Sequence, residues 1–425
     1  MNLKLVPLSL NHNLSVFFIN LALILYPVTL LLVPKMNGLI FGLFVLVGLI
    51  FVVRRRDVAF IVSRDEKLLY LSIIAFFLVV LLITVNAGFV YKQVGKYLYL
   101  LLAIPVYIYL RHNGVRLSYV WYGLAIGAII TVGIAINDVM IKGIPRARGL
   151  THMIIFGDLA LVMGCMSMAG LGWYKQKGAW QWFLPIAALF SGVYASILSQ
   201  SRGGWIAIPF LLIILFWYIR SSISFRLKII LAVLIVIILG TVYTIPQTGV
   251  STQIDRTINS LQQHSDSEIT SNKRGTSVGT RLEMWQASWK MFQENPILGV
   301  GWGHYQEQAQ LQVDQGLRNK SAAAFNHPHS QYFSALAHGG SLGFVTLMVL
   351  FFIPARLFVK YINHGETDDI KRLALAGLVL IVAYMAFGIS EPMLERSRSV
   401  NFFAFYLAVF MAAIYGQKEV ISRKS

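Results

Sequence analysis

Two histidines flank a proline in the segment FNHPHSQYFSALAHGGSLG, residues 325–343, directly before a strongly apolar stretch. A histidine at the mouth of a membrane helix is a candidate general base, because its pKa lies near neutral and it can take a proton from a hydroxyl group. His329 is the first candidate, and His327 and His304 are alternatives. A structural histidine at the membrane interface is the other interpretation of His329, and the residue types alone leave both open.

Arg281, in the segment GTRLEMWQASWKMFQENP, is a second candidate for chemistry. Thr280 and Glu283 have the S/T-x-x-E spacing of a capping box, and Pro296 stops a helix, so the pattern predicts a helix near 281–294. A cation in the first turn faces the positive end of the helix dipole, which costs a few tenths to about 1 kcal/mol. A bound anion would remove that cost. A solvated arginine beside tryptophans is the alternative.

Five further arginines lie in segments that are expected on the same side of the membrane: Arg146 and Arg148 in GIPRARGL, Arg202 in SQSRGGW, and Arg396 and Arg398 in SEPMLERSRS. Arginine suits phosphate, because its planar fork bonds two oxygens at once. The glycines after Arg202 are expected to let a ligand approach the backbone. Contact with lipid headgroups is the alternative for each arginine, but the set favours an anionic ligand at the outer leaflet.

Other classes of site have weak support in the sequence. The motifs DxD and HExxH are absent, and the outer acids Asp138, Asp255, Glu307 and Glu391 are scattered. We therefore predict no metal, and arginines would have to neutralise a bound diphosphate. The single cysteine, Cys165, excludes a disulfide within the chain and a Cys-based metal site. The phosphate-binding patterns GxGxxG and GxxxxGK[ST] are also absent, so we expect no ATP.

The elements that position these residues are membrane helices. The 425 residues are 57% hydrophobic and 13% charged, which is more apolar than a soluble domain. Crossing a bilayer takes about 20 residues of helix, and only helices satisfy the backbone of such segments in lipid. We predict an all-α integral membrane protein with about twelve transmembrane helices, at roughly 14–34, 36–53, 68–86, 94–110, 118–137, 152–173, 180–198, 203–219, 226–246, 330–355, 371–389 and 400–416.

Lys and Arg in the short loops predict the orientation. One set of loops carries about 20 of them and the other about nine, so both termini are expected in the cytoplasm. The net charge of +18 mostly reflects this bias and does not indicate nucleic acid. We divide the chain into nine transmembrane helices (1–246), a large periplasmic loop (247–329), and three further helices with a cytoplasmic tail (330–425).

The large loop is expected to be partly helical. Its stretch 249–279 is Ser/Thr-rich, and we interpret it as a flexible lid that orders on substrate binding. The helix near 281–294 is predicted to lie on the membrane surface, because one stripe of it carries Trp285, Trp289 and Phe292 beside Arg281.

The segment HSQYFSALAHGGSLG matches H-[NSQ]-x9-G-x-x-G, which resembles the signature near the end of the large periplasmic loop of the O-antigen ligases. Its four fixed positions are His329, Ser330, Gly340 and Gly343. SRGG around Arg202 and GTRLEMW around Arg281 resemble the two arginine motifs of that family. In motif order, loop length and number of spans, the chain is similar to the superfamily of O-antigen ligases and polymerases.

The resemblance implies a glycosyl transfer at the periplasmic face of a bacterial inner membrane. The donor would be O-antigen on undecaprenyl diphosphate, and the acceptor a sugar hydroxyl of lipid A-core. His329 would be the general base, and Arg281 would act in catalysis. Arg202 and Arg281, with Arg146 and Arg148, would bind the diphosphate. The reaction would need no cofactor, metal or ATP, and would invert the anomeric configuration.

Three residues are expected to stabilise the site without contacting the substrate: His338, Tyr332 and Arg398. His338 lies nine residues after His329, so on a helix it points to nearly the opposite face, which favours a packing role.

Three other functions remain as alternatives. An O-antigen polymerase uses the same donor, but polymerases tend to have two large arginine-rich outer loops. The related protein oligosaccharyltransferases usually carry more sequence after the last span. A transporter would show ionisable residues near mid-membrane and two similar halves. The clearest acid in an outer half-span is Asp158.

Overall fold

The computed structural model describes residues 12–56, 62–88, 91–178, 180–219 and 277–422, and every regular element among them is helical. The first part contains α1 (His12–Thr29), α2 (Met36–Arg54), α4 (Arg64–Asn86), α5 (Tyr91–Asn113), α6 (Leu117–Ile136), the π-helical turn η1 (Asn137–Ile141), α7 (Met153–Ala169), α8 (Leu171–Lys177), α9 (Phe183–Ser199), α10 (Arg202–Trp205) and α11 (Ala207–Ile219). The second part contains α14 (Ser277–Glu294), α15 (Tyr305–Asp314), η3 (Lys320–Ala323), α16 (Gln331–His364), α17 (Asp368–Phe387), η4 (Met393–Glu395) and α18 (Ser397–Ser422).

The all-helical membrane fold agrees with the sequence prediction. Seven described helices are long and apolar enough to cross a membrane, and an eighth span results if α7 and α8, bent by 55°, are taken together. Helices α1, α9 and α10–α11 are apolar but short. The predicted count of twelve is therefore not confirmed, because these helices coincide with predicted spans but fall below the length that a bilayer requires. The predicted span 226–246 and nearly all of the lid stretch 249–279 lie outside the described residues.

Helices α17 and α18 form the centre of the bundle. In their spanning stretches, 83% of the residues of α17 and 94% of those of α18 are buried, against 33% for α2. Helix α18 packs on α5, and α17 packs on α16 and α7. The peripheral helices instead expose large apolar side chains, such as Phe17, Leu43 and Leu78, as lipid-facing helices do.

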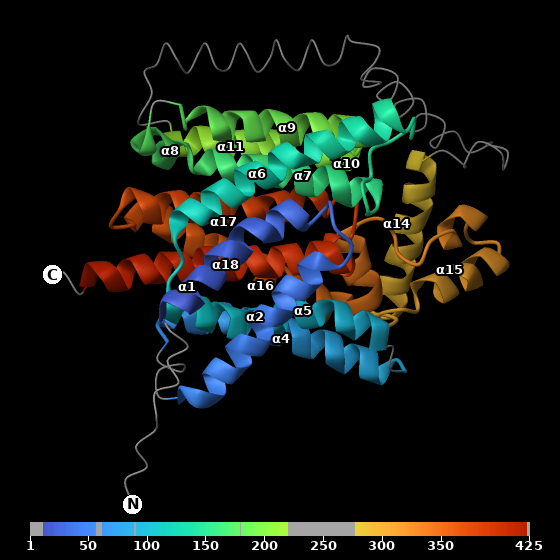
Figure 1. Ribbon diagram of the computed structural model, residues 1–425. Coiled ribbons are helices and arrows are strands. Elements are labelled where there is room, and N and C mark those ends of the chain that lie inside the picture. Colours follow the sequence, from blue (N-terminus) through green and yellow to red (C-terminus); the bar gives the residue numbers. More distant parts are fainter. Residues whose placement is uncertain (1–11, 57–61, 89–90, 179, 220–276, 423–425) are drawn as a thin grey trace, which may run out of the picture.

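One end of the bundle carries α14, α15 and η3 (Figure 1). Figure 1 shows α14 running nearly at right angles to α16 and α18, across their ends, with α15 beside it. The start of α1 and the end of α18 lie at the opposite end of the bundle. The perpendicular course of α14 is the orientation that a helix on the membrane surface requires.

Helix α14 begins earlier than the capping box predicts. It starts at Ser277, so Thr280 lies inside the helix, and the prediction of a start at Arg281 is wrong. The carboxylate of Glu283 does not cap the helix but accepts the backbone N–H of Asn319 at 3.2 Å. The predicted end is right, because α14 stops at Glu294. The dipole argument for Arg281 does not hold, because the arginine is the fifth residue of the helix.

Helices α14, α15 and η3 form a cap (residues 277–323) with a small core of its own. Met284, Ala287, Met291, Tyr305, Ala309, Ala322, Ala323 and Ala337 make up this core, which lies against α16. The hydroxyl of Tyr305 is shared between the carbonyl oxygens of Met284 and Ala322, at 3.2 and 3.1 Å. The described part of the predicted loop is thus a folded, helical layer.

Helix α16 is broken at Gly340, whose backbone has φ 58° and ψ −154°. The segment between α14 and α15 fills the break. The N–H groups of Val300 and Gly301 donate to carbonyls before the break at 2.8 and 2.9 Å, and the carbonyls of Pro296 and Ile297 accept from N–H groups after it at 2.8 and 3.2 Å. Backbone groups that the break frees are therefore satisfied by protein, as a low-dielectric environment demands.

This contact explains the glycines of the AHGGSLG segment. A Cβ at Gly340 would lie 2.5 Å from the carbonyl of Ile297, and one at Gly343 would lie 3.1 Å from the ring of Trp302. At Gly339, a Cβ would lie 2.6 Å from the same ring. The spacing of two motif glycines is therefore a packing requirement of the cap on α16.

Candidate active site

His329 lies where the cap meets the membrane helices, in a strained backbone conformation. Its φ is +51°, which costs a non-glycine residue about 1–2 kcal/mol. The residues on both sides hold it there. The indole N–H of Trp285 donates to the carbonyl of Pro328 at 3.0 Å, and Ser330 is the N-cap of α16. The start of α16 and the cap together fix the direction of the imidazole.

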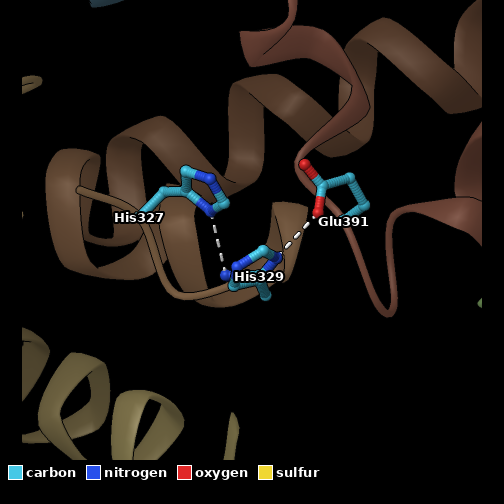
Figure 2. A group of neighbouring side chains, drawn as sticks. All are labelled: His327, His329 and Glu391. Carbon is cyan, nitrogen blue, oxygen red and sulfur yellow. Dashed lines mark hydrogen bonds and ion pairs between the residues drawn. The ribbon is translucent and has the colours of Figure 1, made fainter. Parts of the chain in front are cut away.

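A buried carboxylate holds one nitrogen of that imidazole. Figure 2 shows Nδ1 of His329 pointing at Glu391, with 2.7 Å between Nδ1 and Oε2. An ionised carboxylate only accepts, so Nδ1 is the donor, and in the neutral imidazole the lone pair is on Nε2. The His329 side chain is 12% exposed, whereas Glu391 is fully buried. This is the arrangement of a general base whose tautomer is fixed by a carboxylate.

Arg396 keeps Glu391 ionised. Its Nε and Nη2 atoms lie 2.8 and 2.7 Å from Oε1 of Glu391. Burial raises the pKa of Glu391, but the hydrogen bond from His329 and the charge of Arg396 outweigh burial and lower that pKa to about 2. A buried charge of this kind is stable only when paired, and here both of its oxygens are used.

The first turn of α16 places the Glu391 loop. Gln331 fastens that loop twice, because its N–H donates to the carbonyl of Gly388 at 2.7 Å and its side-chain oxygen accepts from the N–H of Leu394 at 2.8 Å. Tyr332, predicted to support the site, donates to the carbonyl of Met385 at 2.6 Å. The HSQY segment therefore both carries His329 and positions its partner.

His327 is poorly placed to act as the base. Its Nε2 lies 2.8 Å from Nη2 of Arg396, and its Nδ1 lies 3.2 Å from the backbone N–H of His329 (Figure 2). Burial lowers the pKa of His327 to about 3, so the ring is neutral. A neutral imidazole has a single acceptor nitrogen, and each ring nitrogen of His327 faces a donor, so the lone pair is occupied in either tautomer. The other alternative, His304, pairs with Glu307 of α15 at 3.4 Å.

The donor set of His327, His329 and Glu391 would also suit a metal ion, since their ligand atoms lie within 4.8 Å of one another. However, the guanidinium of Arg396 already contacts His327 and Glu391 at 2.8 and 2.7 Å. A metal would have to displace a fixed positive charge from both ligands. The absence of a metal remains a prediction, which a chelator tests.

Arg281 lies within electrostatic range of both Glu391 and Arg146. Arg281 is half-buried and makes no hydrogen bond or ion pair with the part of the chain that the structure describes. Burial lowers the pKa of Arg281, and the charge of Glu391 opposes that shift. Burial and the nearby charge of Arg281 lower the pKa of Arg146. Like charges held together out of water favour a bound anion.

Arg146 also braces the turn that carries Arg202. Its Nε and Nη2 donate to the carbonyls of Ser199 and Gln200, both at 3.0 Å. Gln200 has φ +53°, which ends α9 sharply. The Arg202 side chain is exposed at the start of α10. The loop of Arg146 and the turn of Arg202 thus form one connected surface.

The glycines after Arg202 serve a contact that the sequence reasoning did not foresee. A Cβ at Gly203 would lie 1.8 Å from the hydroxyl of Ser390. Ser201 donates to the buried carboxyl of Asp158 at 2.6 Å. The expected room for a ligand is therefore occupied by protein side chains, and the Arg202 turn packs directly on the loop of Glu391.

The remaining predicted residues lie around this centre. Arg148 is exposed, and its backbone N–H donates to Asp138 at 3.1 Å. Arg398 donates to the carbonyl of Leu150 at 3.1 Å, so it stabilises the loop that carries Arg146 and Arg148. His338 lies in the bundle, 2.9 Å from the hydroxyl of Ser334 and stacked on Trp302, which is a packing position.

Sequence reasoning missed the roles of Glu391 and Arg396. It treated Glu391 as one of several scattered acids and Arg396 as one outer arginine among others. The structure brings both to His329, across 62 residues of chain in the case of Glu391. The signal that could have found them is an acid and an arginine together in the last short outer loop, beside an otherwise apolar span.

Comparison with known proteins agrees with the sequence motifs. Residues 186–348 match the family model described as O-antigen ligase, which confirms the resemblance to that family. The matched region includes the Arg202 turn, α14 and the His329 segment. An uncharacterised protein of Haemophilus influenzae (strain ATCC 51907 / DSM 11121 / KW20 / Rd) is 26% identical over 390 residues, which cover 92% of this chain and 96% of the relative.

Proposed function

We propose that this membrane protein is an O-antigen ligase, which transfers O-antigen glycan from undecaprenyl diphosphate to a sugar hydroxyl of lipid A-core. The family match supports the class of reaction. The observation that carries the proposal is the pairing of His329 with Glu391 at 2.7 Å, beside an arginine without a protein partner among the described residues. The transfer takes place at the periplasmic face of the inner membrane, with both termini in the cytoplasm.

In the proposed mechanism, His329 is the general base. Its Nε2 takes the proton of the acceptor hydroxyl while the oxygen attacks the anomeric carbon of the donor. The carboxylate of Glu391 stabilises the imidazolium that forms. The bond between the anomeric carbon and the diphosphate oxygen breaks on the opposite face, so the anomeric configuration inverts.

The arginines act on the leaving group. Charge develops on the diphosphate as the glycosidic oxygen departs, and fixed guanidinium groups stabilise that charge more in the transition state than in the ground state. Arg281 and Arg146 are the principal ligands, and Arg202 and Arg148 reach the diphosphate from its exposed side. The reaction needs no ATP, because the diphosphate bond of the donor is already activated.

The test is a reconstitution with purified protein in detergent, lipid-linked O-antigen and rough lipopolysaccharide, without ATP. Wild type runs beside His329→Asn, since Asn tolerates a left-handed backbone but supplies no base, and beside Arg281→Gln. Lys290→Gln on the same helix, which pairs only with Glu294 among the described residues, is the matched control.

Each outcome has a definite meaning. Core-attached glycan from wild type and the control only, with both site variants folded, supports the proposal. Glycan that lengthens on its lipid carrier identifies a polymerase. Full activity of His329→Asn would remove the base assignment, and movement of intact donor across a vesicle membrane would identify a transporter.

A further inference from the structure

An aromatic side chain stands exposed beside the proposed base. Phe325 is 45% exposed, although a phenylalanine normally gains from full burial. Its ring centroid lies 4.7 Å from that of His329, with the two planes at 82°, and 6.5 Å from that of His327. The neighbouring side chain of Asn326 is also exposed, and among the described residues it makes no hydrogen bond. An aromatic ring therefore borders the imidazole, and an exposed amide follows it directly in the chain.

The three residues that follow these two side chains are each held by a hydrogen bond to another element. Trp285 holds the carbonyl of Pro328 at 3.0 Å, Arg396 holds His327 at 2.8 Å, and Glu391 holds the imidazole of His329. Three separate contacts within three residues leave the segment little freedom. Residues exposed on a fixed support are preorganised for a ligand, because binding costs them little conformational entropy.

We infer that Phe325 and Asn326 form the subsite for the acceptor sugar, with a pyranose ring lying on the aromatic face and a hydroxyl bound by the amide. This inference rests on the proposed function. The C–H face of a pyranose is apolar and weakly positive, which suits the electron-rich face of an aromatic ring. The amide offers both a donor and an acceptor to hydroxyl groups.

The acceptor is favoured over the donor for two reasons. The acceptor hydroxyl must come within hydrogen-bond distance of Nε2 of His329, so the sugar that carries it lies next to the ring that packs on His329. The donor diphosphate requires cations, which Arg281 and Arg146 supply and which Phe325 and Asn326 do not. A neutral sugar ring is therefore the ligand that matches this border of the site.

The test measures KM for acceptor and donor separately in Phe325→Leu, Phe325→Trp and Asn326→Ala. We expect the KM for the acceptor to rise about tenfold in Phe325→Leu, with the KM for the donor unchanged, because leucine keeps apolar volume but loses the aromatic face. Phe325→Trp should keep a KM near that of wild type. Trp289→Leu on α14, where the indole is 47% exposed, is the matched control and should leave both KM values unchanged.

Several results would overturn the inference. A wild-type KM for the acceptor in Phe325→Leu, or a rise in the donor KM alone, would mean that the ring does not contact the acceptor sugar. If Phe325→Leu keeps the wild-type KM for the acceptor and Phe325→Trp raises it, the ring serves packing or lipid contact. Binding of free core oligosaccharide, measured by calorimetry, separates the two proposals. If wild type binds it and Phe325→Leu does not, the subsite stands even where the wild type fails to transfer glycan.

Discussion

Replacing Glu391 by glutamine should lower kcat about a hundredfold while leaving the protein folded. The carboxylate has a pKa near 2 in place of an ordinary 4.5, so His329 and Arg396 together stabilise it by ~3 kcal/mol beyond the cost of burial. The stabilisation is mutual. If about half of this stabilisation comes from the imidazole, losing it lowers kcat roughly tenfold. The contribution of the imidazole grows when it becomes charged in the transition state.

The assay is steady-state transfer with saturating donor and acceptor, since a defect in the base appears in kcat and one in binding appears in KM. Glu391→Asp should fall between wild type and Glu391→Gln, because it keeps the charge but shortens the reach. Arg396→Gln shows how much of the loss comes from the arginine, which Glu391→Gln deprives of its carboxylate partner. A wild-type kcat in Glu391→Gln, with an inactive His329→Asn, would refute the reasoning.

Four further predictions concern the site and its surroundings. Gly203→Ala should lower kcat/KM about tenfold or more, because its Cβ would collide with the side chain of Ser390. Adding Ser390→Gly should restore most of the activity. If it does not, Gly203 is needed for another reason. Arg281→Lys should retain more activity than Arg281→Gln but bind donor less tightly than wild type, as measured by KM, because an ammonium cannot bond two phosphate oxygens in a plane. Because the folded pKa of Glu391 lies below its ordinary value, its contribution to stability is present above about pH 4.5 and disappears as the pH falls through about 2. The Tm difference between wild type and Glu391→Gln should therefore persist down to about pH 5 and shrink only below that, and a difference that vanishes above pH 5 would contradict the ion pairing. EDTA should leave wild-type activity unchanged, and loss of activity that returns with a divalent cation would make His327, His329 and Glu391 metal ligands.

Local chemistry made much of the fold predictable. Spans such as 68–86 and 371–389 are visible in the sequence because lipid contact demands a continuous apolar run, and α4 and α17 cover them. The helix of Arg281 was also found, and its end was placed correctly by Pro296. Its start was misplaced, since the partner of Glu283 is Asn319, 36 residues away, and no local pattern records that contact.

The candidate site was predictable only in part. The type of residue 329 and its place before an apolar helix suggested a base, because both facts are local. Its partner was not predictable, since Glu391 reaches it through the loop after α17 and the direction of that loop depends on Gln331. The sequence indicated that the glycines beside Arg202 are needed for close approach, but it assigned that approach to a ligand, whereas the structure shows Ser390. Sequence records that space is needed, and only structure shows which atoms fill it.

Because the segment between α14 and α15 fills the break in α16, the cap and this membrane helix should unfold together as one cooperative unit. Opening the contact between the cap and the helix would leave four backbone hydrogen bonds unmade in a place that water reaches poorly, at about 1–3 kcal/mol each. The amides of Ser341 and Leu342 should therefore exchange with deuterium at the same slow rate as those of Val300 and Gly301. Deleting residues between α14 and α16 would remove the cap and also the backbone hydrogen bonds that satisfy the break in α16. Selection on the cap then acts on membrane insertion and folding as well as on the proposed catalysis.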